Sequence, residues 1–194
     1  MDTTYDKLET LLGVALAPID RTRAVSLVFV FSLLMAAAAQ IIVPLGPVPI
    51  TGQTFVVVLT GALLGSRLGA AAMVVYLAEG VVGLPFFAGG TSGIAHLLGP
   101  TGGYLVAFPA AAYITGAFAE NGWDKRFATA VVAMAAGSTV VMLSGWVWLM
   151  VSTNSSAAVA FQLGVGRFIA GDLVKILLAA ALLPTGWALL RRRS

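Results

Sequence analysis

Apolar residues are arranged along this chain in six long runs, and the polar residues between them are few. The runs cover about residues 24–43, 55–64, 68–87, 104–119, 127–151 and 159–190. A helix needs roughly 20 predominantly apolar residues to cross the hydrocarbon core of a bilayer, so most of these runs are long enough to span a membrane. The pattern therefore predicts an all-α membrane protein with six transmembrane helices.

Two of the runs differ in length from the others. The run at 55–64 is short for a full crossing, so the Pro-rich residues 48–54 before it are expected to lie at membrane depth and line a cavity. The run at 159–190 is over 30 residues long, so we expect it to be tilted, kinked or preceded by a loop. Residues 88–103 are expected to form a Gly-rich loop, and Pro109 is a candidate kink in the helix that follows.

Composition narrows the class of protein. Only 10% of the 194 residues are charged and 59% are hydrophobic, whereas soluble domains carry about 25% charged residues. These proportions exclude a water-soluble globule, a disordered chain and a nucleic-acid-binding protein. The chain has no Cys, which excludes disulfides and thiolate metal sites. Neither the length nor any GxxxxGKS or GxxxxGKT motif provides an ATPase, so any ATP hydrolysis is expected on a partner chain.

The positions of Lys and Arg predict the orientation in the membrane. They lie before the first run, between the second and third, between the fourth and fifth, and after the last, at Lys7, Arg21, Arg23, Arg67, Lys125, Arg126 and 191–193. The other three loops contain neither residue. By the positive-inside rule both termini are predicted to be cytoplasmic, N-in and C-in.

This topology divides the chain into three parts. Residues 1–23 are predicted to be a cytoplasmic N-terminal segment, residues 24–190 the six-helix transmembrane domain, and residues 191–194 a basic cytoplasmic tail. In the first part, apolar residues recur at helical spacing and predict a short amphipathic helix on the membrane surface; they are Leu8, Leu11, Leu12, Ala15 and Leu16.

Four ionisable residues lie inside the predicted helices: Glu79, Arg167, Asp172 and Lys175. Such a group near a helix centre costs about 2.5–3.5 kcal/mol on insertion scales, so it usually belongs to a site or a polar pathway. Asp172 and Lys175 are three residues apart and share a helix face. We interpret them as a solute site, the alternative being a structural pair of neutralised charges. Arg167 is near enough to the outer surface to snorkel, and Glu79 is either a structural partner of these cations or a second acceptor.

Small residues recur on two of the predicted helices. Gly61, Gly65 and Gly69 are spaced by four, which lets helices approach closely and favours packing within the bundle. The patch Ala36–Ala39 is a candidate docking surface for another membrane protein. With Gln40 it also resembles a signal-peptide cleavage site, although the apolar run continues beyond it.

The sequence offers little evidence for an enzyme or a metal site. His96, the only histidine, is expected to be a surface residue of an outer loop, and no metal-binding motif occurs, so no metal or cofactor is predicted. Gly90–Gly93 matches the GxSG motif of rhomboid intramembrane proteases. Those enzymes take their general base from a histidine on a later helix, and the later helices here carry none.

Several stretches together carry a resemblance to a known family. They are Gly46–Thr54, Thr60–Gly69, Tyr76–Gly90 and Leu98–Leu105, followed by Gly171, Asp172 and Lys175. Across about residues 24–190 the chain resembles the BioY family, the biotin-binding S components of energy-coupling factor (ECF) transporters. One departure is Ala170, where the family usually has proline. We expect this change to relax the entry to the helix without removing either ionisable group.

The resemblance implies a multi-pass protein of the prokaryotic plasma (inner) membrane, with an S-component type bundle, that captures biotin from outside and takes part in its uptake. The implied partners are an ECF T component, which would dock at Ala36–Ala39, and two ATPase subunits. A stand-alone or proton-coupled secondary transporter, with Glu79, Asp172 and Lys175 as a relay, is the alternative.

The resemblance also suggests how biotin would be held. Asp172 and Lys175 are implied to meet the ureido ring. The biotin carboxylate is left to Arg167, to backbone amides of the Gly-rich loop or to hydroxyls. The further candidates for the lining of the site are Thr51, Gln53, Thr54, Tyr76, Gly90, Thr91, Ser92 and Tyr104.

Overall fold

The computed structural model describes residues 10–44 and 46–191 of the chain. Eight α-helices are formed there: α1 (Leu11–Ala15), α2 (Arg21–Ala39), α3 (Gln53–Val81), α4 (Ile94–Leu98), α5 (Gly102–Glu120), α6 (Phe127–Ser152), α7 (Ala157–Phe161) and α8 (Ile169–Arg191). Strands β1 (Ile42–Val43) and β2 (Ile50–Thr51) pair as an antiparallel hairpin, with Ile42 opposite Thr51. Among these residues, five helices are long and apolar enough to cross a membrane: α2, α3, α5, α6 and α8.

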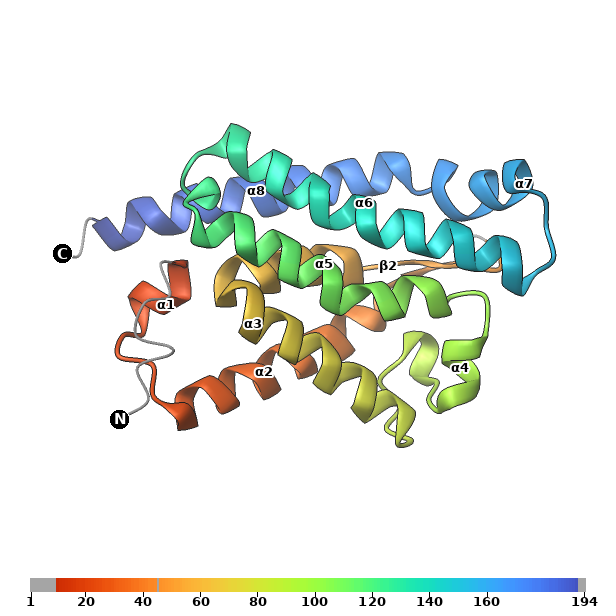
Figure 1. The fold of residues 1–194 in the computed structure, drawn as a ribbon, viewed down its shortest axis with the longest axis horizontal. Helices are drawn as coiled ribbons and strands as arrows, with labels where there is room; N and C mark the ends of the chain where they lie inside the picture. Colours follow the sequence, from red (N-terminus) through yellow and green to blue (C-terminus); the bar gives the residue numbers. More distant parts are fainter. Residues whose placement is uncertain (1–9, 45, 192–194) are drawn as a thin grey trace.

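The long helices run lengthwise in the bundle, with α6 and α8 on one side, α5 in the middle, and α2 and α3 on the other side (Figure 1). Helices α3 and α5 are the most buried of the five and pack closely against each other, whereas α8 is the most exposed. The hairpin, α4 and α7 gather at one end of the bundle. The start of α2, the α5–α6 connection and the end of α8 lie at the opposite end (Figure 1).

Helix α3 contains the second predicted run and most of the third, and bends sharply between them at Gly65. Gly65 has φ 84° and ψ 175°, a conformation that glycine adopts without a steric penalty. The arm before the bend, residues 53–64, is only about 18 Å long at 1.5 Å per residue. The glycine spacing brings helix backbones together, as predicted: a Cβ on Gly69 would lie 2.9 Å from the Gly61 Cα.

Two predicted helix ends and one predicted loop near α3 are wrong. Helix α2 ends at Ala39 rather than Val43, because the chain turns into the β1–β2 hairpin. The second arm of α3 ends at Val81 rather than Phe87, since Gly83 takes φ 112° and turns the chain out of the helix. The predicted Gly-rich loop 88–103 contains a helix, α4, and a 3-10 turn, η2 (Ala88–Gly90).

The last apolar run is interrupted, as its length predicted. A π-helical turn, η4 (Gln162–Gly166), follows α7, and α8 begins afresh at Ile169. Ala170, which replaces the proline usual in the family, is exposed in the first turn of α8. In contrast, α5 continues through Pro109, the candidate kink, as a single helix. Helix α6 matches its predicted run to within one residue.

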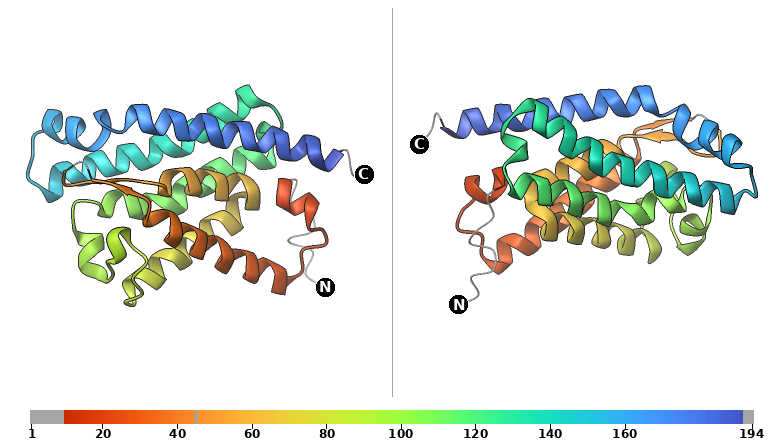
Figure 2. Two further views of the ribbon diagram at one scale, coloured as in Figure 1. Left: turned by 180° about the vertical axis from the view of Figure 1, so that it is seen from behind. Right: turned by 45° about the horizontal axis from the view of Figure 1, so that its top comes forward.

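Two expectations for the N-terminal third need correction. Ala36, Ala38 and Ala39 are buried, and only Ala37 of the predicted docking patch is exposed, because the other three pack inside the bundle. The described part of the predicted amphipathic helix, α1, packs against α3 and α8 at the end of the bundle (Figure 2). Leu8, a member of that predicted helix, lies outside the described residues.

Candidate functional site

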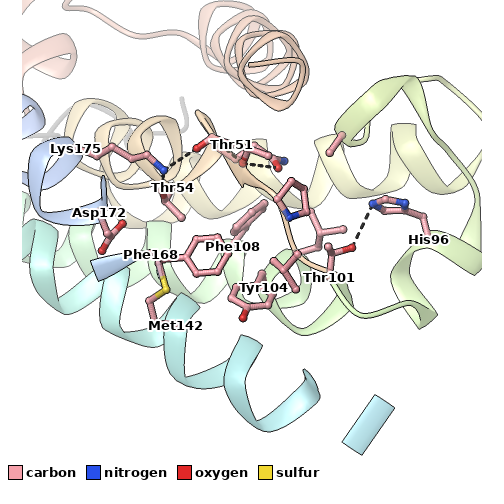
Figure 3. A pocket seen from close by; sticks show the side chains of 15 residues that line it. Thr51, Thr54, His96, Thr101, Tyr104, Phe108, Met142, Phe168, Asp172 and Lys175 are labelled. Atoms are coloured by element: carbon pink, nitrogen blue, oxygen red, sulfur yellow. Dashed lines mark hydrogen bonds between the residues drawn. The ribbon is translucent and has the colours of Figure 1, made fainter. Parts of the chain in front are cut away.

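A cavity lies at the end of the bundle that carries the hairpin and α4. It is built from the hairpin, the start of α3, η2, α4, α5, α6 and the start of α8. The lining residues are Val48, Pro49, Thr51, Gln53, Thr54, Ala88, His96, Thr101, Tyr104, Leu105, Phe108, Met142, Phe168, Asp172 and Lys175 (Figure 3).

One end of the cavity carries both charged residues of α8. Asp172 lies in the first turn of the helix, is 9% exposed, and its carboxylate accepts a hydrogen bond from the Ser138 hydroxyl. The Lys175 ammonium donates to the Thr51 carbonyl oxygen at 2.6 Å and to the Thr54 hydroxyl at 2.9 Å. Between them, these contacts leave one carboxylate and one ammonium beside an open space.

Asp172 and Lys175 each have hydrogen-bond partners on other elements. Asp172 is hydrogen-bonded across to α6, and Lys175 reaches the hairpin and α3 on the other side. Both residues are described, and no ion pair joins them. Their side chains share a helix face but have separate partners, so both retain hydrogen-bonding capacity toward the cavity.

The middle of the cavity is aromatic and apolar. Phe108, Phe168 and Tyr104 lie between the charged end and the opposite end (Figure 3). The rings of Tyr104 and Phe168 are 6.3 Å apart, and the Tyr104 hydroxyl donates to the Gly164 carbonyl at 2.7 Å. Tyr104 therefore fastens the π-helical turn before α8 to α5, which holds the entry to the Asp172-bearing helix in place.

The opposite end of the cavity contains His96, contrary to the expectation that this histidine is a surface residue. Its ring stacks on Phe87 with centroids 5.0 Å apart. Nδ1 lies 3.0 Å from the Thr91 hydroxyl, and Nε2 lies 3.3 Å from the Thr101 hydroxyl. Burial lowers the pKa of His96 from its ordinary value, so the imidazole is neutral at pH 7.

The hydroxyl protons around His96 determine its tautomer. Thr91 donates its proton to the Ala88 carbonyl at 2.9 Å, so its oxygen accepts from His96 Nδ1–H. Nε2 is then an acceptor, and Thr101 donates to it. Protonation of His96 at Nε2 would make this nitrogen a donor, so the Thr101 hydroxyl would no longer donate to it. The end of the cavity at His96 would then offer donors to a ligand in place of acceptors.

Six of the residues predicted for the site do not line the cavity, and one of them, Ser92, is exposed. Tyr76 is buried behind the cavity wall. Gly90 and Thr91 are in the loop before α4, where the Gly90 amide donates to Gln40. Arg167 is exposed near Gly46. Glu79 is half-buried, and one of its carboxylate oxygens has no hydrogen-bond partner among the described residues.

The hypothesis of an intramembrane protease gains no support from the positions of Ser92 and His96. Ser92 is exposed, and the His96 ring nitrogens contact the threonines on either side instead. In the part of the chain that the structure describes, no three His, Cys, Asp or Glu side chains lie close enough together to hold a metal ion.

The residues that the sequence interpretation missed are mostly apolar. Thr101, Leu105 and Phe108 recur with Tyr104 at helical spacing, so this face of α5 was detectable from periodicity. Met142, Phe168 and Val48 come from three separate elements and share no spacing that a sequence reveals.

Comparisons with known proteins identify the family of this chain. The BioY family model matches residues 8–192. The chain is 45% identical over 158 residues to the "Probable biotin transporter BioY" of Pyrococcus horikoshii, covering 80% of this chain and 90% of that protein. It is 36% identical over 151 residues to the "Biotin transporter BioY" of Thermotoga maritima, covering 78% and 88%.

A solved structure shares the fold. The crystal structure of the S-component for biotin from an ECF-type ABC transporter superposes with a TM-score of 0.77 at 25% identity, covering 90% of this chain and 93% of that one. The match therefore extends over most of both chains. On the strength of the family model and these relatives, the chain belongs to the BioY family.

Proposed function

We propose that this protein captures biotin in the cavity from the outer side of the membrane and serves as the non-catalytic, substrate-binding subunit for biotin uptake. The observation that carries the proposal is the division of the cavity into a charged end, an aromatic middle and a second polar end. Biotin has the same division, since its ureido ring, its apolar thiophane ring and chain, and its carboxylate follow one another.

The charged end suits the ureido ring. Its two N–H groups need acceptors and its carbonyl needs a donor. Asp172 supplies an acceptor and Lys175 a donor, and both have capacity beyond their bonds to Ser138, Thr51 and Thr54. Hydrogen bonds to charged groups are the stronger ones, so this end is expected to provide most of the selectivity.

The middle and the far end suit the rest of the molecule. The rings of Phe108, Phe168 and Tyr104 would cover the thiophane ring and the aliphatic chain. His96 and Thr101 would meet the carboxylate. The negative charge would favour the imidazolium, and the Thr101 proton released by it would then be donated to the carboxylate.

We further propose that the chain crosses the membrane six times, N-in and C-in, with the two arms of α3 as separate crossings. Basic residues gather at one end of the bundle, at the start of α2, in the α5–α6 connection and at the end of α8; they are Arg21, Arg23, Lys125, Arg126 and Arg191. Arg67 lies beside the bend of α3, and Arg167 is the exception, just before the start of α8. This grouping is what the positive-inside rule requires. Reporter fusions at Thr91 and Ser155 are expected outside and one at Asp124 inside; an inside signal at Ser155 would contradict six crossings.

For partners, we propose an ECF T component and two ATPases in the plasma membrane. With three of the four alanines buried, the docking surface would be the exposed side of α2 around Ala37. Ala37→Trp is expected to abolish energised uptake in cells while the purified protein still binds biotin. Phe29→Trp, at another exposed position of α2, is the matched control for bulk on this helix. Uptake that survives Ala37→Trp would place the partner elsewhere.

The test of the function is calorimetric titration of the purified protein in detergent with biotin, thiamine and riboflavin. Biotin alone is expected to bind. Biotin methyl ester, which lacks the carboxylate charge, is expected to bind more weakly but measurably, because the ureido end is unchanged. Binding of another vitamin in place of biotin would overturn the proposal.

A further inference from the structure

Tyr76 is completely buried in the second arm of α3 and does not line the cavity. Its ring meets the edge of Phe87 with centroids 5.8 Å apart. Its hydroxyl lies between two polar partners: the Gln53 side-chain amide donates to it from 2.8 Å, and it donates to the Phe86 carbonyl at 3.2 Å. One of these partners, Gln53, lines the cavity, and the other belongs to the loop before α4.

The count of protons at this hydroxyl determines the orientation of the Gln53 amide. A tyrosine hydroxyl has one proton, and the Phe86 carbonyl has none to give. The proton is therefore used on Phe86, and the Tyr76 oxygen must accept from the Gln53 NH₂ group. With the amide reversed, the Gln53 and Phe86 oxygens would compete for one proton, and one buried acceptor would remain unsatisfied.

The orientation extends to the charged end of the cavity. With its nitrogen on Tyr76, Gln53 turns Oε1 toward Thr51, whose hydroxyl donates to it at 3.0 Å. The Thr51 carbonyl in turn accepts from Lys175. Hydrogen bonds thus link Lys175 to Thr51, Thr51 to Gln53, Gln53 to Tyr76 and Tyr76 to Phe86; at Thr51 the two bonds are made by its carbonyl and its hydroxyl.

The result is a wall with more acceptors than donors. Gln53 presents an oxygen rather than an NH₂ group, the Thr51 hydroxyl proton is already used, and Asp172 adds a carboxylate. Lys175 is the charged donor at this end of the cavity, and the Thr54 hydroxyl, whose oxygen accepts from Lys175, is a neutral one. A group with two N–H donors flanking one carbonyl fits such a wall, whereas a group with several acceptors does not.

We propose that Tyr76 is a positioning residue for ligand recognition: from behind the cavity wall it sets the orientation of Gln53, and through it the acceptor pattern that selects a ureido group. This role rests on the proposed function, because it assumes that biotin is the ligand. The hydrogen bond from the Tyr76 hydroxyl to the Phe86 carbonyl also links Gln53 to the loop in which Phe87 stacks on His96.

A double-mutant cycle tests the proposal, with biotin affinity from calorimetry and the melting temperature measured for every variant. Tyr76→Phe removes only the hydroxyl, and Gln53→Ala removes the amide. Each change is expected to weaken biotin binding roughly 10-fold or more. Since Tyr76 acts through Gln53, the double variant should bind no more weakly than Gln53→Ala alone. Additive losses, or an unchanged affinity in Tyr76→Phe, would overturn the proposal.

Two further variants separate positioning from general stability. Tyr113→Phe, at an exposed position of α5, is the matched control and should bind like the wild type. Gln53→Glu keeps an oxygen toward the cavity and should bind biotin more tightly than Gln53→Ala; an equal loss in both would contradict the acceptor pattern, even if Tyr76→Phe fails to fold. Failure of the wild type to bind biotin would instead refute the proposed function.

Discussion

Two buried aspartates at opposite ends of the bundle have similar local chemistry and different surroundings. Asp172 accepts a hydrogen bond from Ser138, and Asp124, in the turn η3 (Trp123–Lys125), accepts one from the Trp187 indole at 2.6 Å. A lysine accompanies each: Lys175 reaches past Asp172 to Thr51, and the Lys125 ammonium lies 5.0 Å from the centre of the Trp187 ring.

What separates the two sites is space. Asp172 borders the cavity, whereas Asp124 is fully covered, and its second oxygen has no hydrogen-bond partner among the described residues. Burial raises the pKa of Asp124, because the covered carboxylate loses its hydration, although the Trp187 hydrogen bond opposes this. The cavity beside Asp172 is therefore what makes it the candidate for a ligand site, whereas Asp124 links η3 to α8 through Trp187.

The largest effect that tests this comparison is expected at the cavity. Asp172→Asn and Lys175→Met should each weaken biotin binding by on the order of 100-fold, because each leaves a buried ligand group without its charged partner. Their melting temperatures should stay near that of the wild type, and titration calorimetry with thermal melts checks both. Asp124→Asn, the matched change at the other end, should bind biotin within about 2-fold of the wild type.

The double variant Asp172→Asn/Lys175→Met distinguishes a ligand site from a structural pair. A structural pair leaves one charge stranded in each single variant, and removal of both restores the protein. We expect a protein that folds and does not bind. Recovery of tight binding in this double variant would falsify the assignment of both residues to the ligand.

At the other end, Trp187→Phe is expected to reduce stability rather than binding. The change removes the indole N–H and leaves the Asp124 carboxylate buried without its donor, which costs about 1–3 kcal/mol. The affinity for biotin should not change, since Trp187 lies outside the cavity. Chemical or thermal unfolding measures the first effect and calorimetry the second; a large loss of affinity would show that the two ends are coupled.

A smaller effect is expected from the pH dependence of biotin binding. The free protein holds His96 with a lowered pKa, and a bound carboxylate would raise it, so binding takes up a proton. The affinity should therefore rise as the pH falls from about 7.5 to 5.5, by roughly 10-fold at most. His96→Gln should remove this dependence. Equal slopes in the two proteins would exclude His96 from the carboxylate end.

The smallest effect concerns the pH dependence of stability at Asp124. A carboxyl with a raised pKa holds its proton in the folded state at pH values where the unfolded state has lost it. Its contribution is thus fully present below the ordinary pKa of 3.8 and is lost as the pH rises through the raised value. The melting temperature of the wild type should fall relative to Asp124→Asn across that range; parallel curves would contradict the raised pKa.

The sequence by itself predicted the membrane-spanning runs and a large part of the candidate site. Helix α6 ends within one residue of its predicted run, because a helix in a bilayer satisfies its own backbone hydrogen bonds and its extent follows from local apolarity. The sequence alone indicates Asp172 and Lys175 as candidate site residues, because a charged side chain inside an apolar run is costly whichever neighbours the helix packs against. The family resemblance added Thr51, Gln53, Thr54 and Tyr104, all of which line the cavity.

Only the tertiary structure decided what surrounds those residues. His96 lies in the cavity because α4 folds back against α5, where Thr101 meets its ring. Tyr76 stands behind the wall because the bend of α3 at Gly65 sets the direction of the second arm, and the buried side of Ala36–Ala39 depends on where α2 packs. Local propensity and apolar spacing indicate which side chains avoid lipid or water. They do not state which distant backbone carbonyl or hydroxyl a side chain meets, because that partner comes from another part of the chain and is fixed only when the helices pack.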